Sequence, residues 1–212
     1  MRPALLILLC VVALAPGCAT LNIAPGPPVK GEAKAVKALE PPSSLRATAI
    51  VRVDRIFSVK GRALIAAERP DRFRIEVLGP LNSTLALFVS DGHGLYIFSD
   101  GKSARYEWKD PRVPFPFRPV EVVSALLGAR PEGAGDYALS MDGDGHITDI
   151  VKKGDGEPLL TAAMSDYRTV SGADVPFSIT IEDGKKRLGV RYSAVEVNPE
   201  LGTDFFDTGS LP

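Results

Sequence analysis

The chain has 212 residues, with 25 Lys and Arg against 26 Asp and Glu and a net charge of −1. This balance lacks the strongly basic character of nucleic-acid-binding domains, so no nucleic-acid partner is expected. Both cysteines, Cys10 and Cys18, lie near the start of the chain, which leaves an exported domain no pair for a disulfide.

Residues 1–17 have the features of a secretory signal. Arg2 precedes an apolar run from Ala4 to Ala15, which is shorter than the about 20 apolar residues that a membrane-spanning helix needs. The small residues before Cys18 resemble the lipobox of bacterial lipoproteins, in which the signal is cut just before a cysteine that is then acylated. The alternative is an ordinary secretory signal cut near Gly17. We expect lipidation at Cys18 and retention at a membrane surface, since two acyl chains suffice for stable anchoring.

Residues 18–44 are expected to form the lipidated cysteine, a proline-rich tether and one short helix. The prolines bracket a stretch that has helical spacing but is too short to be stable alone, Glu32 to Leu39. The bracketing residues are Pro25, Pro27, Pro28, Pro41 and Pro42.

Residues 45–212 are expected to form one mainly antiparallel, all-β domain. Gly-containing turn signals recur at close intervals and separate short runs of β-forming residues, which is typical of an antiparallel meander. The expected strands span residues 45–53, 62–69, 73–77, 85–89, 94–99, 104–108, 137–141, 146–152, 159–167, 175–182 and 188–197.

The stretch from Phe73 to Val89 predicts a hairpin with an unusual tip. Its first arm alternates Ile75 and Val77 with charged residues, and its second arm repeats the period of two with Leu85 and Leu87. The connection, GPLNS, has ordinary turn residues except for a leucine at its centre, Leu81. Leu81 either folds back onto the core or stays outside to contact an apolar partner.

One helix is expected inside the meander, over Val120 to Ala129. Val123, Leu126 and Leu127 recur at helical spacing, and Gly128 is a typical stop signal. Such a helix either covers an apolar sheet face or closes the mouth of a barrel.

The sequence shows no catalytic or metal-binding constellation. The segment DGDGHITD, Asp142 to Asp149, fails as an EF-hand because its first and twelfth loop positions lack acidic ligands, and a β-turn is the better interpretation. His93 and His146 are expected to be exposed turn residues without ligand partners at metal spacing. We therefore expect no enzyme activity, no metal and no cofactor. The cluster at Lys185 to Arg187 is a solvated hairpin end or, alternatively, a contact for anionic head groups.

Several of these stretches together are similar to the LolB family of outer-membrane lipoprotein receptors, in the LolA/LolB lipoprotein-carrier superfamily. They are the lipobox, the tether, the helix ending in LLG, and the runs FRIEVLGPLNSTLALFVSDGHGLYIFSDGKSARY and YRTVSGADVPFSITIEDGKKRLGVRYSAVEVNPEL. The resemblance implies a half-open antiparallel β-barrel whose short helices cap an apolar groove. It also implies that the loop at Gly79, Pro80 and Leu81 protrudes and helps to move acylated cargo into the outer membrane. The residues expected in the groove or its lid are Ile75, Val77, Leu85, Leu87, Val123, Leu126 and Leu127.

The implied partners are the acyl chains of lipoproteins, a periplasmic LolA-like carrier and outer-membrane lipid, with the protein itself a monomer. Ala19, directly after Cys18, is compatible with sorting to the periplasmic face of the outer membrane. Two other functions stay open. One is a structural or partner-binding envelope lipoprotein with the same fold and no cargo transfer. The other, an enzyme acting on lipid or peptidoglycan, lacks a visible nucleophile, base or metal set.

Overall fold

The computed structural model describes residues 40–54, 59–108, 110, 113, 117–133, 137–154, 158–208 and 211. These residues belong to one compact unit, Val36–Pro212. The signal, Cys18 and the expected helix at residues 32–39 lie outside the described residues and stay predictions. No helix in the described part of the chain is long and apolar enough to cross a membrane.

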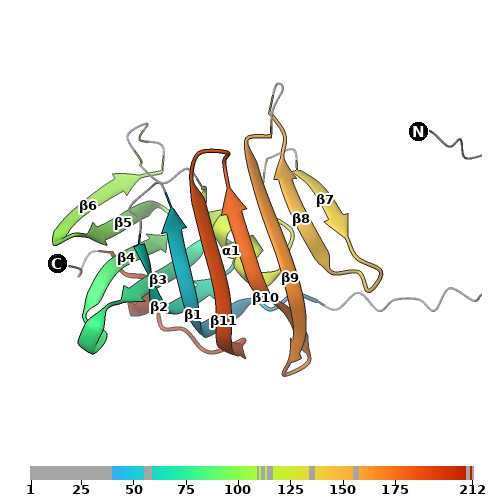
Figure 1. Ribbon diagram of the computed structural model, residues 1–212, viewed down its shortest axis with the longest axis horizontal. Coiled ribbons are helices and arrows are strands. Elements are labelled where there is room, and N and C mark those ends of the chain that lie inside the picture. Colours follow the sequence, from blue (N-terminus) through green and yellow to red (C-terminus); the bar gives the residue numbers. More distant parts are fainter. Residues whose placement is uncertain are drawn as a thin grey trace, which may run out of the picture. The chain divides into compact units, whose positions relative to one another are not determined.

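Eleven antiparallel strands form a single sheet that does not close on itself (Figure 1). The order is β6-β5-β4-β3-β2-β1-β11-β10-β9-β8-β7, so the chain runs from the middle to one edge, crosses to the other edge and returns to pair β11 with β1. The expectation of an antiparallel, half-open barrel is confirmed. The strands are β1 (Ser44–Asp54), β2 (Val59–Glu68), β3 (Arg72–Leu78), β4 (Thr84–Asp91), β5 (Gly94–Ser99), β6 (Lys102–Glu107), β7 (Tyr137–Met141), β8 (Ile147–Lys152), β9 (Leu160–Val170), β10 (Ala173–Glu182) and β11 (Arg187–Val197).

Alternation along the strands gives the sheet an apolar inner face and a mixed outer face. In β3, Phe73, Ile75 and Val77 are buried on the inner face, whereas Arg74 and Glu76 are only partly covered on the outer face. The turns follow local rules. Asp100 and Gly101 join β5 to β6 with positive φ angles of 53° and 71°, which matches the right-handed twist of the paired strands.

The helix α1 (Pro119–Leu127) packs on the inner face, against β2, β3, β9 and β10. It begins after Arg118, whose capping box with Glu121 satisfies free backbone groups, and it ends at Gly128 in the left-handed conformation, with φ 67°. All of its residues except Val120 are buried. A helix with so little exposed surface is part of the core as well as a cover for the sheet.

A short C-terminal segment covers part of the outer face. The 3-10 helix η2 (Thr203–Phe206) contacts β3 and β4, with the ring of Phe206 buried, and Leu211 packs against Leu87, Val89 and Tyr96. Apolar residues on both faces of β4 are thereby removed from water.

Candidate functional site: the exposed loop and the covered inner face

The loop between β3 and β4 holds Leu81 in solvent. Its side chain is 101% exposed relative to a free residue, so of the two placements considered for Leu81 the structure shows the outer one. Leu81 and Asn82 both adopt left-handed backbone angles, with φ of 57° and 60°. Such angles cost on the order of 1–3 kcal/mol for each non-glycine residue. The fold therefore holds an apolar side chain outward in a conformation that leucine disfavours.

The loop's own contacts fix this conformation. The Gly79 N–H donates to the Ser83 carbonyl at 2.7 Å, and both the N–H and the hydroxyl of Ser83 donate to the Pro80 carbonyl, at 3.2 and 2.9 Å. Arg62 of β2 donates to the Asn82 side-chain carbonyl and ties the loop to the sheet. Leu81 is thus presented by a closed turn and not by a loose tip.

Gly79 is required by the close packing at the loop's base. A Cβ atom built on it would lie 2.7 Å from Cγ of Leu85, inside van der Waals contact. Leu85 is 41% exposed and leans over the loop, so it belongs to the loop's support.

The residues expected to share the groove are divided between the two faces of the sheet. Ile75 and Val77 lie on the inner face, opposite Phe88 and Ala86 of β4, and are fully buried. Leu87 pairs with Glu76 and lies on the outer face under the C-terminal segment. The register shift beside Leu78 leaves Leu85 unpaired between Thr84 and Ala86. The structure therefore does not bring Leu85 and Leu87 together with Ile75 and Val77, because β4 is apolar on both faces.

The three helix residues do meet the inner face. Val123, Leu126 and Leu127 have no exposed surface and share one core cluster with Ile75 and Val77. The helix thus occupies the place where an apolar ligand of the inner face would lie.

A buried carboxylate fastens this helix to the edge strand β7 and to its neighbour β8. Glu121 accepts hydrogen bonds at Oε1 from Lys152 Nζ at 2.9 Å, the Tyr137 hydroxyl at 3.0 Å and Arg118 Nε at 3.1 Å. Its Oε2 accepts from the Arg118 N–H at 2.8 Å. Burial and the neighbouring Glu121 carboxylate raise the pKa of Tyr137, which keeps the phenol protonated as a donor. This clamp was not predicted from the sequence, although a lone acid among the valines of VEVV was its signal.

His146 forms a second polar link at the same side of the sheet. Its ring nitrogens lie 2.9 Å from an Asp142 oxygen and 3.0 Å from an Asp174 oxygen, and its ring stacks on Tyr167 at 4.3 Å. Partial burial lowers the pKa of His146, but the hydrogen bonds with Asp174 and Asp142 outweigh it and raise the pKa overall. The expectation of an exposed turn residue is wrong for His146, which joins the β7–β8 turn to β10. Asp142, Asp144 and His146 each offer one ligand atom, and these three atoms lie within 4.8 Å of one another, so they could hold a metal ion.

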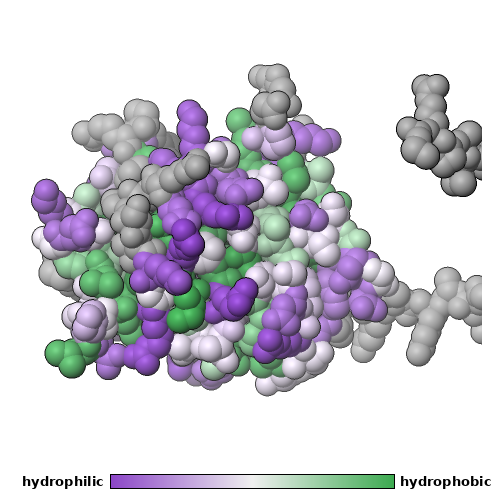
Figure 2. All heavy atoms as spheres, viewed as in Figure 1, coloured by the Kyte–Doolittle hydropathy of each residue, from purple (hydrophilic) through white to green (hydrophobic). Residues whose placement is uncertain are grey.

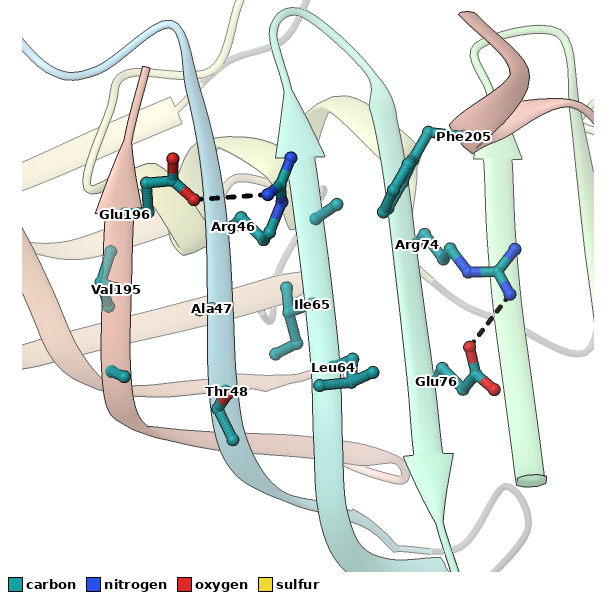
Figure 3. Close-up of a pocket in the computed structure, with 12 residues that line it drawn as sticks. Arg46, Ala47, Thr48, Leu64, Ile65, Arg74, Glu76, Val195, Glu196 and Phe205 are labelled. Atoms are coloured by element: carbon teal, nitrogen blue, oxygen red, sulfur yellow. Dashed lines mark hydrogen bonds and ion pairs between the residues drawn. The ribbon is translucent and has the colours of Figure 1, made fainter. Parts of the chain in front are cut away.

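A groove of about 360 Å3 lies on the opposite, outer face, over β1, β2, β3 and β11 (Figure 3). Leu64 lies between two ion pairs, Arg46–Glu196 at 3.5 Å and Arg74–Glu76 at 3.0 Å. The Phe205 ring of η2 is part of the groove wall. This apolar surface is separate from the inner face that α1 covers.

Comparison with known proteins identifies the fold. The chain matches no protein-family model, and no curated protein matches its sequence. Its structure is similar to a LolA superfamily protein from Nitrosomonas europaea, with 14% identity, 84% of this chain and 96% of that chain covered and a TM-score of 0.52. A DUF1329 family protein from Desulfovibrio piger matches with 9% identity, 84% and 93% coverage and a TM-score of 0.52. The class is therefore the LolA-like half-open barrel.

Proposed function

We propose that this protein is a LolB-like receptor, which takes acylated lipoproteins from a periplasmic carrier and inserts them into the outer membrane. The observation that carries the proposal is Leu81, a fully exposed leucine held outward at a disfavoured backbone angle. Burying a leucine side chain yields about 1.5–3 kcal/mol, and an acyl-chain boundary is a place where Leu81 gains it.

Transfer of this kind requires partition and no covalent chemistry. An acyl chain leaves water for an apolar face because each buried CH₂ contributes about 0.8 kcal/mol. The inner face offers such a surface once α1 gives way, since acyl chains can replace the contacts that Val123, Leu126 and Leu127 make with the sheet. The bilayer is the deeper sink, so cargo moves onward without an energy source.

The proposal includes anchoring through Cys18 at the periplasmic face of the outer membrane, as the lipobox and Ala19 indicate. Membrane fractionation of cells that make the native protein tests this part. Recovery in the inner membrane would contradict it.

A second function is favoured by one observation: α1 fills the inner face. A structural or partner-binding envelope lipoprotein needs no more than such a filled core. A hydrophobic-dye or fatty-acid binding assay on a Cys18→Ser variant separates the two. Saturable binding that an acyl chain displaces supports the receptor, whereas no saturable binding supports the structural role.

A further inference from the structure

Exposed apolar side chains gather on one side of the domain. Seven large hydrophobic residues are exposed in the described part of the chain. Five of them lie on the outer side of β1, β2 and β4, in the loop between β3 and β4, or in η2. These five are Ile50, Leu64, Leu81, Leu85 and Phe205. Figure 2, which views the outer side, shows hydrophobic groups interspersed with strongly hydrophilic ones.

The same face is basic, although the whole chain carries a net charge of −1. Among the described outward positions of β1, β2, β3 and β11, eight basic residues stand against four acidic ones, a net charge of +4. The basic residues are Arg46, Arg52, Lys60, Arg62, Arg72, Arg74, Arg187 and Arg191, and the acidic residues are Asp54, Glu68, Glu76 and Glu196.

Ion pairs balance much of this charge but leave a surplus in one place. Each of the four acids pairs with an arginine of the face, and Arg187 pairs with Glu182 of β10. Among the described residues, the basic residues of the face that no ion pair joins to an acid are Lys60, Arg62 and Arg191, and Arg191 also lies near Asp166 of β9, an acid that pairs with Arg168. In the sheet register Ile50 pairs with Arg62 on one side and with Arg191 on the other. Lys60 lies two residues before Arg62, on the same face of β2.

This row of residues continues into the exposed loop. Ile50, 47% exposed, has a guanidinium on either side, and Arg62 reaches the loop at Asn82, next to Leu81. Leu64 lies two positions along β2 from Arg62, at the edge of the outer groove. Apolar side chains flanked by long basic ones are typical of surfaces that lie in a bilayer interface, where arginine stems cover apolar area and their heads meet phosphate.

We propose that the outer face of β1, β2 and β11, continuous with the Leu81 loop, is a membrane-docking surface for lipids with anionic phosphate head groups. Ile50, Leu64 and Leu81 enter the head-group boundary, while Lys60, Arg62 and Arg191 bind the phosphates. The surface sets the orientation in which the domain meets the bilayer. The proposal goes beyond cargo transfer, because docking needs no lipoprotein.

Co-sedimentation of the Cys18→Ser protein with vesicles tests the proposal. Phosphatidylcholine vesicles containing phosphatidylglycerol should bind the protein, with much weaker binding to phosphatidylcholine alone and loss of binding as salt is raised. Lys60→Gln with Arg191→Gln should weaken binding about 25-fold, since each basic residue near such a surface contributes about fivefold, or ~1 kcal/mol.

Matched variants elsewhere on the domain serve as controls. Lys102→Gln with Lys153→Gln removes the same charge from exposed positions on β6 and after β8, and should change binding less than twofold. Ile50→Ser should weaken binding, whereas Leu159→Ser, at a leucine that is 56% exposed and lies off this face, should not.

Three results would overturn the proposal: wild-type protein that ignores anionic vesicles, binding that salt leaves unchanged, or control variants that lose as much as the test variants. Because dye binding to the inner face is measured separately, failure of docking and failure of the receptor function remain distinguishable.

Discussion

The buried clamp at Glu121 gives a prediction with a calculable size. Glu121→Gln keeps the shape of the side chain but removes the negative charge that Lys152 and Arg118 face. It also replaces one accepting oxygen by an NH₂ group, which cannot accept the hydrogen bonds that these side chains donate. Removing one partner of a fully buried pair costs about 3–5 kcal/mol. Lys152 is 23% and Arg118 44% exposed in their side chains, so both can recover water, and we expect the free energy of unfolding to fall by about 1–3 kcal/mol.

Urea unfolding measures this loss as a lower midpoint at an unchanged slope. Lys152→Met is the matched partner, and the double variant should lose less than the sum of the two single losses, since both changes remove one interaction. A loss below about 0.5 kcal/mol, typical of a surface change, would show that the clamp does not hold α1.

The same variant tests whether α1 must leave the inner face for acyl chains to bind. If the bound state needs a displaced helix, weakening the closed state by ~1.4 kcal/mol raises the open fraction and the apparent affinity for an acyl probe about tenfold. Dye or fatty-acid titration of Glu121→Gln against wild type makes the comparison. Equal or weaker binding by a folded variant would contradict a displaceable helix.

Two further predictions concern stability. The raised pKa of His146 means that the folded state binds its proton more tightly than the unfolded state does. This stabilisation is complete below the unfolded pKa of about 6.5 and is lost as pH rises through the folded pKa. In urea unfolding, His146→Ala should therefore cost more stability at pH 5.5 than at pH 9, and an equal cost at both pH values would refute the link. Gly79→Ala should destabilise by about 1–3 kcal/mol through its contact with Leu85, and Leu85→Ala should relieve part of that loss; additive effects would refute the contact.

Much of the fold could be predicted from the sequence because its signals are local. The turn glycines and the alternation in stretches such as Phe73–Val77 predicted the strands to within a few residues. The helix was predicted to run to Ala129, two residues too far, but the predicted stop signal Gly128 is the residue at which the backbone turns left-handed.

The faces of β4 could not be predicted. Leu85 to Val89 is apolar throughout, so a period of two cannot tell the inner face from the outer, and the register shift beside Leu78 depends on pairing with β3. The burial of Leu87 also depends on Leu211, more than 100 residues away in the chain.

Long-range polar partners were equally hidden. Glu121 and Lys152 are 31 residues apart, and His146 and Asp174 are 28 apart, so neither pair has a sequence spacing that indicates contact. The exposure of Leu81, in contrast, was one of two stated alternatives, because a leucine among Gly, Pro, Asn and Ser conflicts with ordinary turn chemistry.

The most direct test of the receptor account is delivery of a bound lipoprotein to vesicles by Leu81→Glu, with Leu159→Glu as the control at another exposed leucine. Because Leu81 makes no buried contact, the variant should unfold within about 0.5 kcal/mol of wild type. A carboxylate at the tip opposes entry into the acyl region, so Leu81→Glu should still take up acylated cargo from the carrier but should not release it into the bilayer, while Leu159→Glu does both. Normal delivery by Leu81→Glu, or its failure to fold, would contradict the role of Leu81 in transfer.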